Sequence, residues 1–155
     1  MTLSLKARRL AIRCAYVGLR LYWFVFRPKV VGVKCIVMND DHVLLVRHTY
    51  GRSSWDLPGG SAKRREPPIE AARREMHEEL GRRIEDWQEL GVLYTTTDHH
   101  RDNLHLFGTE LGDRKLDIDL VELAEAGWFR RDQLPSDTGS FVGRLLAQAA
   151  MASES

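Results

Sequence analysis

Three glutamates of the sequence, Glu75, Glu78 and Glu79, are spaced so that they could bind one cation together. On an α-helix, which turns by about 100° per residue, their side chains project from one face and their charges converge. Like charges at this spacing destabilise a helix by roughly a few tenths of a kcal/mol per pair. Clustered carboxylate oxygens suit Mg²⁺ or Mn²⁺, which also bind water and phosphate oxygens. The pattern predicts a divalent-metal site, and its alternative is a solvated acidic patch offset by neighbouring arginines.

The residues around these glutamates extend the pattern. Residues 59–81 read GGSAKRREPPIEAARREMHEELG. This stretch resembles the Nudix box, G-x5-E-x7-R-E-U-x-E-E-x-G-U, where U is an aliphatic residue. Eight of the nine specified positions match, at Gly60, Glu66, Arg74, Glu75, Met76, Glu78, Glu79 and Gly81. The ninth holds Arg82, and Ile84, two residues later, is the candidate for the missing apolar contact.

The resemblance extends beyond this motif. The segment VLLVRHTYGRSSWDLPGG resembles the strand and loop that lead into the box, and VELAEAGWFRRDQLP resembles the segment that closes the family's sheet. Together they cover about residues 30 to 135. The chain is therefore identified as a member of the Nudix hydrolase superfamily. The family implies an α/β/α sandwich with a mixed central sheet, here as a Nudix domain over residues 29–155 with an N-terminal extension over residues 1–28.

The resemblance also implies a reaction and its cofactor. Nudix enzymes split a phosphoanhydride bond in a nucleoside diphosphate linked to another group, with Mg²⁺ or Mn²⁺ neutralising the phosphate oxygens. By resemblance, the metal ligands are the side chains of Glu75, Glu78 and Glu79 and the backbone carbonyl of Gly60. Glu75 has the alternative role of base on the attacking water. Glycine suits position 60 because no side chain blocks the approach of the backbone to metal and phosphate.

Two further residues of the motif have a supporting role in the family. A charge-assisted pair between Glu66 and Arg74 would tie the loop to the helix and fix the rotamers of the glutamates. The general base is open, because some family members use a carboxylate outside the box; the candidates in the late loop are Glu122 and Glu125. Three histidines, His99, His100 and His105, invite a catalytic interpretation, but a hairpin tip and a strand position account for them.

The substrate is predicted less sharply. The sequence lacks the additional residues of the branches that cleave NADH, ADP-ribose and dinucleoside polyphosphates, and it resembles the MutT-type nucleoside triphosphate pyrophosphohydrolases. The predicted substrate-binding residues are Tyr50, Trp55, Gly59 and Gly60. Tyr94 and Phe107 are further aromatic candidates for stacking on a base, and each aromatic residue has a place in the core as its alternative. Two other functions stay open: hydrolysis of a lipid-linked or isoprenoid diphosphate at a membrane, and nucleotide binding without catalysis.

The N-terminal segment differs from the rest of the chain in charge. The first 39 residues contain eight basic residues and no acidic one, which leaves about −7 of net charge for the remainder. Apolar residues at helical spacing predict a basic amphipathic helix over residues 4–26, ended by Pro28. Its apolar side could pack on its own domain, on the partner subunit of a homodimer, or on an anionic membrane surface. No nucleic-acid-binding motif is present, and no polynucleotide partner is expected.

Length and composition are those of one domain. The chain has 155 residues, 43% of them hydrophobic, which is enough for a single core. Its apolar N-terminal run is shorter than the about 20 residues that span a bilayer, and two cysteines without metal-binding spacing fit a reducing compartment, so a cytoplasmic location is expected. The remaining predicted elements are strands at 30–38 and 42–48, a helix from Pro67 or Pro68 to Leu80 capped by Gly81, a hairpin of 88–97 and 104–111, a loop at 113–126, a strand at 127–130 and a helix at 141–150.

Overall fold

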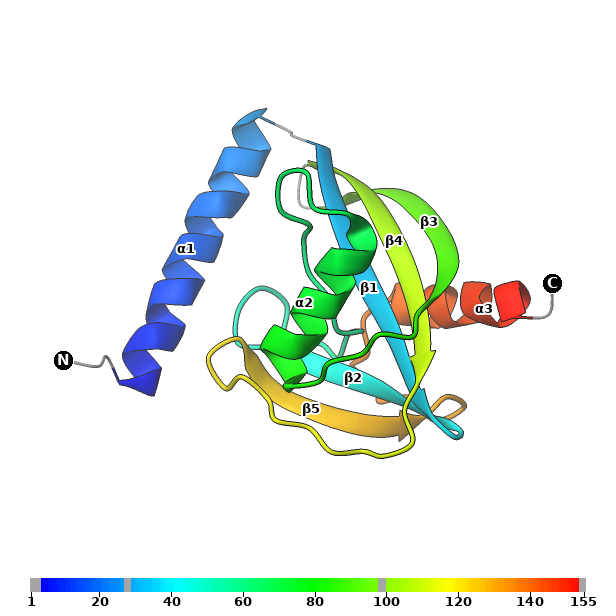
Figure 1. Ribbon diagram of the computed structural model, residues 1–155. Helices are drawn as coiled ribbons and strands as arrows, with labels where there is room; N and C mark the ends of the chain where they lie inside the picture. The colour runs from blue at the N-terminus through cyan, green and yellow to red at the C-terminus, as the bar shows by residue number, and fades with distance from the viewer. Residues whose placement is uncertain (1–3, 27–28, 98–99, 154–155) are drawn as a thin grey trace.

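The computed structural model describes residues 4–26, 29–97 and 100–153. Figure 1 shows a twisted sheet with one helix on each face and a third helix standing along one side. In chain order the elements are α1 (Leu5–Phe26), β1 (Lys29–Asn39), β2 (His42–His48), α2 (Pro68–Leu80), β3 (Gln88–Thr97), β4 (His100–Glu110), β5 (Leu123–Arg130) and α3 (Val142–Ser153).

The sheet is mixed, and both of its faces are covered. Its strand order is β3-β4-β1-β2-β5, with β1 and β4 parallel and the other neighbours antiparallel. Side chains alternate along β1, so Val33 and Cys35 face α2 whereas Ile36 faces α3. Each face therefore has its own apolar cluster, and Met76 and Leu145 are the buried contributions of the two helices. The predicted α/β/α sandwich with a mixed central sheet is confirmed.

The hairpin of β1 and β2 opens beyond its turn. The two strands pair directly only at Met38 with Val43 and at Asn39 with His42, beside the turn at Asp40. Further along, residues 56–62 lie between the strands. Asp56 exchanges two backbone hydrogen bonds with Val46 of β2, and residues 58–62 bond to residues 31–35 of β1. The loop that leads to α2 is thereby fixed to both strands by backbone hydrogen bonds.

Two strand boundaries differ from the prediction. β4 begins at His100, although 98–103 was predicted as the tip of a hairpin, because residues 101–103 join the parallel ladder with residues 29–31 of β1. Asp98 and His99 lie outside the described residues. β5 begins at Leu123, four residues before its predicted start, because it pairs with β2 up to His48. In both cases pairing with a strand distant in sequence extends the strand beyond its local pattern.

The N-terminal helix is confirmed as α1, which runs along one side of the molecule (Figure 1). Arg9 Nε donates a hydrogen bond of 2.8 Å to the carbonyl of Leu120, in the segment before β5. About two turns further along, the ring of Tyr16 lies 5.2 Å from that of Tyr50, after β2. None of the helices in the described part of the chain is long and apolar enough to cross a bilayer.

Candidate active site

Helix α2 has well-defined ends. Pro68 stands in its first turn, where no amide partner is needed. Gly81 ends it in the left-handed conformation, with φ of 63°, and the Gly81 N–H donates to the carbonyl of His77 at 3.1 Å. Ile84 is 6% exposed and packs in the α2 cluster, whereas Arg82 pairs with Asp113 at 2.8 Å. Ile84 thus makes the apolar contact that position 82 lacks, as predicted.

The three glutamates of α2 differ in burial. Glu79 is 1% exposed and Glu75 is 9% exposed, on the same helix face as the core residues Ala72 and Met76. The side chain of Glu78 is half exposed. A buried carboxylate is costly unless charge or hydrogen bonds compensate it. Two carboxylates side by side in the interior are therefore the least expected feature of this helix.

Glu79 has little compensation within the protein. Its Oε2 accepts a hydrogen bond of 3.2 Å from the Gly59 N–H, and its Oε1 lies 3.9 Å from His48 Nδ1. Burial, with the charge of Glu75 as the second cause, raises the pKa of Glu79 to about 8. Burial also raises the pKa of Glu75, against the opposing effect of Arg74. Both carboxylates would hold their charge more easily beside a further cation.

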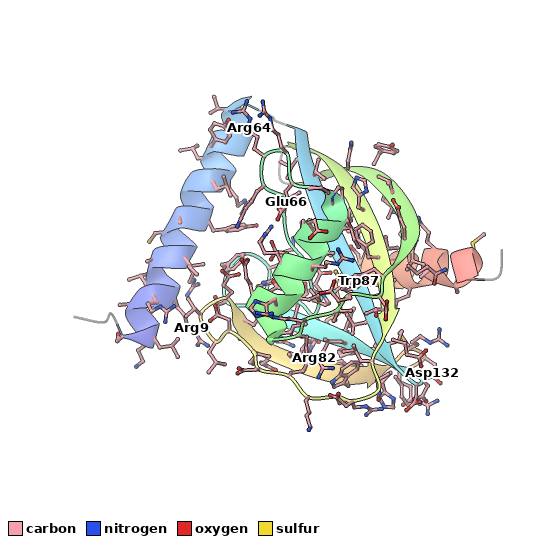
Figure 2. All side chains as sticks on the ribbon, viewed as in Figure 1. Arg9, Arg64, Glu66, Arg82, Trp87 and Asp132 are labelled. Carbon is pink, nitrogen blue, oxygen red and sulfur yellow. The ribbon has the colours of Figure 1, made fainter. Side chains whose placement is uncertain are left out.

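Arg74 joins the loop before α2 to the carboxylates of the helix. Its guanidinium binds Glu66 with two hydrogen bonds of 2.8 and 2.9 Å, and its Nη1 also donates to Glu75 at 2.7 Å and to Glu78 at 3.0 Å. The hydrogen bonds from Arg74 lower the pKa of Glu66 to about 2. The Glu66–Arg74 pair expected from the motif is present, and in Figure 2 Glu66 lies at the start of α2. Arg74 therefore holds the carboxylates of Glu75 and Glu78 in fixed positions on α2.

Two glycines bring the loop backbone close to the carboxylates. Gly59 has φ of 140°, and a Cβ there would lie 2.2 Å from the carbonyl oxygen of Val33. A Cβ on Gly60 would lie 2.5 Å from the carboxylate carbon of Glu75. The Gly60 carbonyl accepts a hydrogen bond of 2.8 Å from the Val33 N–H, which leaves its second lone pair for another partner. Glycine is required at position 59 by its φ and by the approach to the Val33 backbone, whereas at position 60 a Cβ would displace the Glu75 carboxylate.

The donor set fits a hard divalent cation. Carboxylate oxygens of Glu75 and Glu79 and a backbone carbonyl at Gly60 are oxygen ligands of the kind that Mg²⁺ prefers. Within the described residues, no three His, Cys, Asp or Glu side chains converge on one point as they stand. Arg74 Nη1 bonds to both Glu75 and Glu78, so its positive charge meets their carboxylates directly. Arg74 offsets the charge of Glu75 but not that of Glu79. A cation between these two buried carboxylates would relieve their repulsion.

A cavity of about 240 Å³ adjoins the carboxylates through His48, which lines it and whose Nδ1 lies 3.9 Å from Glu79 Oε1. Tyr50 lines it, as do Lys34 of β1 and Tyr16 of α1. Burial, followed by the charges of Glu122 and Glu79, raises the pKa of the Tyr50 phenol. Arg52 and Ser54 of the following loop also contribute to the lining. Of the predicted substrate contacts, Tyr50 is thus placed at a cavity next to the glutamates.

His48 was not predicted as part of the site. Its ring lies 5.2 Å from that of Tyr50, it lines the same cavity, and its buried Nδ1 has no hydrogen-bond partner. Burial lowers the pKa of His48 to about 4, so the ring is neutral near pH 7. The alternation of side chains along β2 could have indicated this position, because Leu44 and Val46 face α2 and His48 is the next residue on that face.

The other aromatic candidates lie elsewhere. Trp55 is 8% exposed and packs in the α3 cluster, with its ring 4.8 Å from that of Phe129. Phe107 is 3% exposed and belongs to the α2 cluster. Tyr94 is 79% exposed on β3. The structure therefore assigns Trp55 and Phe107 to the core, which was the stated alternative for each aromatic residue.

The candidates for the general base are separated by the fold. Glu122 is partly buried, and its pKa is raised by burial and then by the charges of Asp119 and Glu78. Its carbonyl accepts a hydrogen bond of 2.8 Å from the Thr49 N–H. Glu125 is exposed on β5, opposite Arg47 of β2. Glu122 is thus the one of the two that is electrostatically coupled to the glutamates of α2.

The candidate histidines occupy strand positions. His105 lies in the middle of β4, between Val33 of β1 and Val92 of β3, as its predicted strand position requires. His100 is the first residue of β4, and His99 lies outside the described residues. Within the described residues, the histidine that approaches a buried carboxylate is instead His48, with its Nδ1 3.9 Å from Glu79 Oε1.

Comparison with known proteins agrees with this arrangement. The chain is 37% identical over 82 residues to an ADP-ribose pyrophosphatase of Mycobacterium tuberculosis, which covers 49% of this chain and 40% of that protein. It is 41% identical over 67 residues to an RNA pyrophosphohydrolase of Halorhodospira halophila, over 43% of this chain and 35% of that protein. The matched segment therefore spans less than half the length of each of these curated relatives.

A solved structure shows the same fold. The MutT NUDIX hydrolase of Burkholderia pseudomallei superposes with a TM-score of 0.71 at 24% identity, over 77% of this chain and 97% of that one. The family model described as the NUDIX domain matches residues 28–148, which include the whole sheet, α2 and the buried glutamates. The chain belongs to the NUDIX domain family.

Proposed function

We propose that this protein is a divalent-metal-dependent hydrolase that cleaves a phosphoanhydride bond in a nucleoside triphosphate or another nucleoside diphosphate derivative. The observation that carries the proposal is the pair of buried carboxylates, Glu75 and Glu79, beneath the Gly59-Gly60 backbone. Such a pair destabilises a protein unless a cation shares it. The relatives named above, a pyrophosphatase and a pyrophosphohydrolase, support the same class of reaction.

Glu75, Glu78, Glu79 and the Gly60 carbonyl would hold Mg²⁺, or Mn²⁺ in its place. A cation held there would supply positive charge to neutralise phosphate oxygens and to activate water for attack. The protein's own part is positional. Glu66 holds Arg74, and Arg74 in turn fixes the carboxylates of Glu75 and Glu78, so that the ligands are oriented before substrate arrives.

The proton of the attacking water needs an acceptor. Glu75 is one candidate, but it is paired with Arg74 at 2.7 Å, which favours its ligand role. Glu122 is the second, because it is partly buried and its raised pKa brings it closer to the range in which a carboxylate is an effective base. We propose Glu122 as the base and Glu75 as a metal ligand.

The cavity beside the carboxylates is proposed to hold the group attached to the phosphates. At about 240 Å³ it is smaller than the roughly 300 to 1,000 Å³ of sites that bury a drug-sized ligand, so it fits one group of a substrate. Tyr16 and Tyr50 offer aromatic faces for a nucleobase, and Arg52 adds a positive charge. The lining therefore favours a nucleotide over a lipid tail.

The test is a panel of substrates assayed with Mg²⁺, measuring released phosphate and pyrophosphate. The panel contains nucleoside triphosphates, ADP-ribose, a 5′-triphosphate RNA and an isoprenoid diphosphate. We expect turnover of at least one free nucleotide, abolished by EDTA and reduced at least about a hundredfold by Glu79→Gln. The matched control, Glu89→Gln, changes an exposed acid on β3 and keeps wild-type turnover. Absence of activity on every phosphoanhydride, with the protein folded, would refute the proposal.

A further inference from the structure

Helix α1 has an inner side that is tied to the body. Arg9 bonds to the carbonyl of Leu120, next to the segment that carries Glu122, and Tyr16 packs against Tyr50. A Cβ on Gly51 would lie 3.2 Å from the Tyr16 hydroxyl, which shows how closely the two segments approach. In Figure 2 Arg9 lies where α1 faces the segment before β5. These contacts fix which side of α1 faces away from the domain.

The side facing away is apolar. We call it the outer face of α1 and define it by Leu10, Val17, Leu21 and Val25, which are 63, 67, 65 and 62% exposed. Their spacing of seven, four and four residues places them in one row along the helix. Single exposed apolar residues are ordinary, but a continuous row of them marks an interaction surface. The outer face is distinct from the side that carries Tyr16.

The outer face also lacks charge. Around the helix axis, at about 100° per residue, Lys6 and Arg8 lie roughly 80° to either side of Tyr16. The other basic residues of the helix lie within this range, namely Arg9, Arg13 and Arg20. An arc of about 200° therefore contains no ionisable Lys, Arg, Asp or Glu side chain, and it contains the whole outer face. Basic residues border the arc on both sides. This is the distribution found in helices that lie in a membrane interface.

The charge of α1 favours a membrane over a second copy of the chain as the partner of the outer face. Helix α1 contains five basic residues and no acidic one. Pairing two copies through their outer faces would bring these like charges together without any acid on α1 to offset them. An anionic lipid surface instead attracts each basic residue. The helix, 22 residues long, is not apolar enough to span a bilayer within the described residues, so it would lie in the plane of the surface.

We propose that the outer face of α1 docks this protein on an anionic phospholipid surface, with Leu10, Val17, Leu21 and Val25 inserted among the acyl chains and the flanking basic residues on the headgroups. The inner side keeps its contacts with Tyr50 and Leu120 in this arrangement. The cavity beside the glutamates therefore retains its wall while the protein is bound. The proposal concerns location and does not depend on the hydrolase activity.

Flotation of the full chain with vesicles tests the proposal. One set of vesicles is phosphatidylcholine alone, and the other is phosphatidylcholine mixed with phosphatidylglycerol. We expect the protein to float with the anionic vesicles and to remain largely in solution with the neutral ones. Substituting Lys6→Gln or Arg13→Gln should weaken binding to the anionic vesicles by about fivefold each. A wild-type protein that floats with neither set would overturn the proposal.

The outer face is tested by Val17→Gln with Leu21→Gln, because glutamine keeps helix propensity and both positions are exposed. This variant should stay in solution with both vesicles. Leu10→Gln with Val25→Gln is a second variant of the same row, should the first fail to fold. The matched control, Tyr94→Gln with Met151→Gln, removes two side chains 79 and 73% exposed elsewhere and should float normally.

Two outcomes contradict the outer-face assignment. If both outer-face variants float like the wild type, the row does not contact lipid. If the wild type is a dimer by light scattering, and Val17→Gln with Leu21→Gln makes it a monomer without any change in vesicle binding, the outer face is an interface between two copies.

Discussion

Helices α2 and α1 depart from the usual distribution of residues in opposite ways. Helix α2 buries two carboxylates, Glu75 and Glu79, whereas α1 exposes a row of aliphatic side chains that includes Val17 and Leu21. Charged residues are rarely buried without a partner, and large apolar rows are rarely exposed. The buried charges cost stability in the isolated protein, and the exposed aliphatic side chains gain none from burial. On the two proposals, each helix is arranged for something outside the chain, a cation for α2 and a lipid surface for α1.

The largest effect on stability should come from the support of the buried charges. Arg74→Gln removes hydrogen bonds to three carboxylates, and we expect the free energy of unfolding to fall by about 3 kcal/mol. Its sequence neighbour Arg73 pairs only with exposed Glu70 and Glu85, so Arg73→Gln should cost less than about 1 kcal/mol. Urea denaturation of both variants makes the comparison, and equal losses would show that Arg74 does not organise the site.

The second-largest effect on stability should come from the Gly59 backbone next to the carboxylates. Gly59→Ala forces a Cβ to within 2.2 Å of the Val33 carbonyl oxygen at a φ of 140°, so we expect a loss of about 2 to 3 kcal/mol. Gly143→Ala, in α3 with nothing within 4 Å, should instead stabilise by about 0.5 to 1 kcal/mol. Thermal and urea unfolding measure both. A Gly59→Ala protein of wild-type stability would mean that the loop does not approach β1 as described.

The buried carboxylate should also give the metal-free protein an unusual pH dependence. The folded pKa of Glu79, about 8, lies above its unfolded value, so the folded state binds the extra proton. Stability from this group is fully present below about pH 4.5 and is lost as the pH rises towards 8, by up to about 1.4 kcal/mol per pH unit. Unfolding measured in EDTA across this range should show the decline, and Glu79→Gln should flatten it. An identical slope in the variant would contradict the assignment.

The inner side of α1 gives the smallest effect. If Tyr16 forms a wall of the substrate cavity, Tyr16→Ala should raise KM for the best substrate about tenfold with little change in kcat, since a stacked ring contributes about 1 to 3 kcal/mol. Tyr16→Phe should keep most of the binding because it keeps the ring. Tyr94→Ala, at an exposed tyrosine of β3, is the control. An unchanged KM in Tyr16→Ala would show that this residue of α1 does not contribute to substrate binding.

The sequence predicted the parts of the molecule that depend on local patterns. Helix α2 and its Gly81 cap follow from the residue pattern, and the Glu66–Arg74 pair and the compensating Ile84 follow from the resemblance to the Nudix box. Spacing on one helix face also indicated that the glutamates converge, although it could not show that Glu78 is exposed while its neighbour Glu79 is buried. That difference depends on where the sheet lies.

The parts that were missed depend on partners distant in sequence. β4 and β5 begin earlier than predicted because β1 and β2 extend them. His48 reaches Glu79 only through the packing of β2 against α2. The apolar residues of α1 were visible in the sequence, but their helical spacing was interpreted as a single apolar side. The contacts of Arg9 with Leu120 and of Tyr16 with Tyr50 separate the inner side from the outer face.

The central claim is that the carboxylates of α2 hold a divalent cation, and metal-dependent stability tests it most directly. Thermal unfolding of the wild type and of Glu79→Gln is measured at pH 7.5 with EDTA and with rising Mg²⁺ or Mn²⁺. The account predicts that metal raises the Tm of the wild type in a saturable manner, since ligands that bind only the folded state stabilise it. Glu79→Gln should have the higher Tm in EDTA and gain little from metal. An equal metal-induced shift in both proteins, or none in the wild type, would contradict the account.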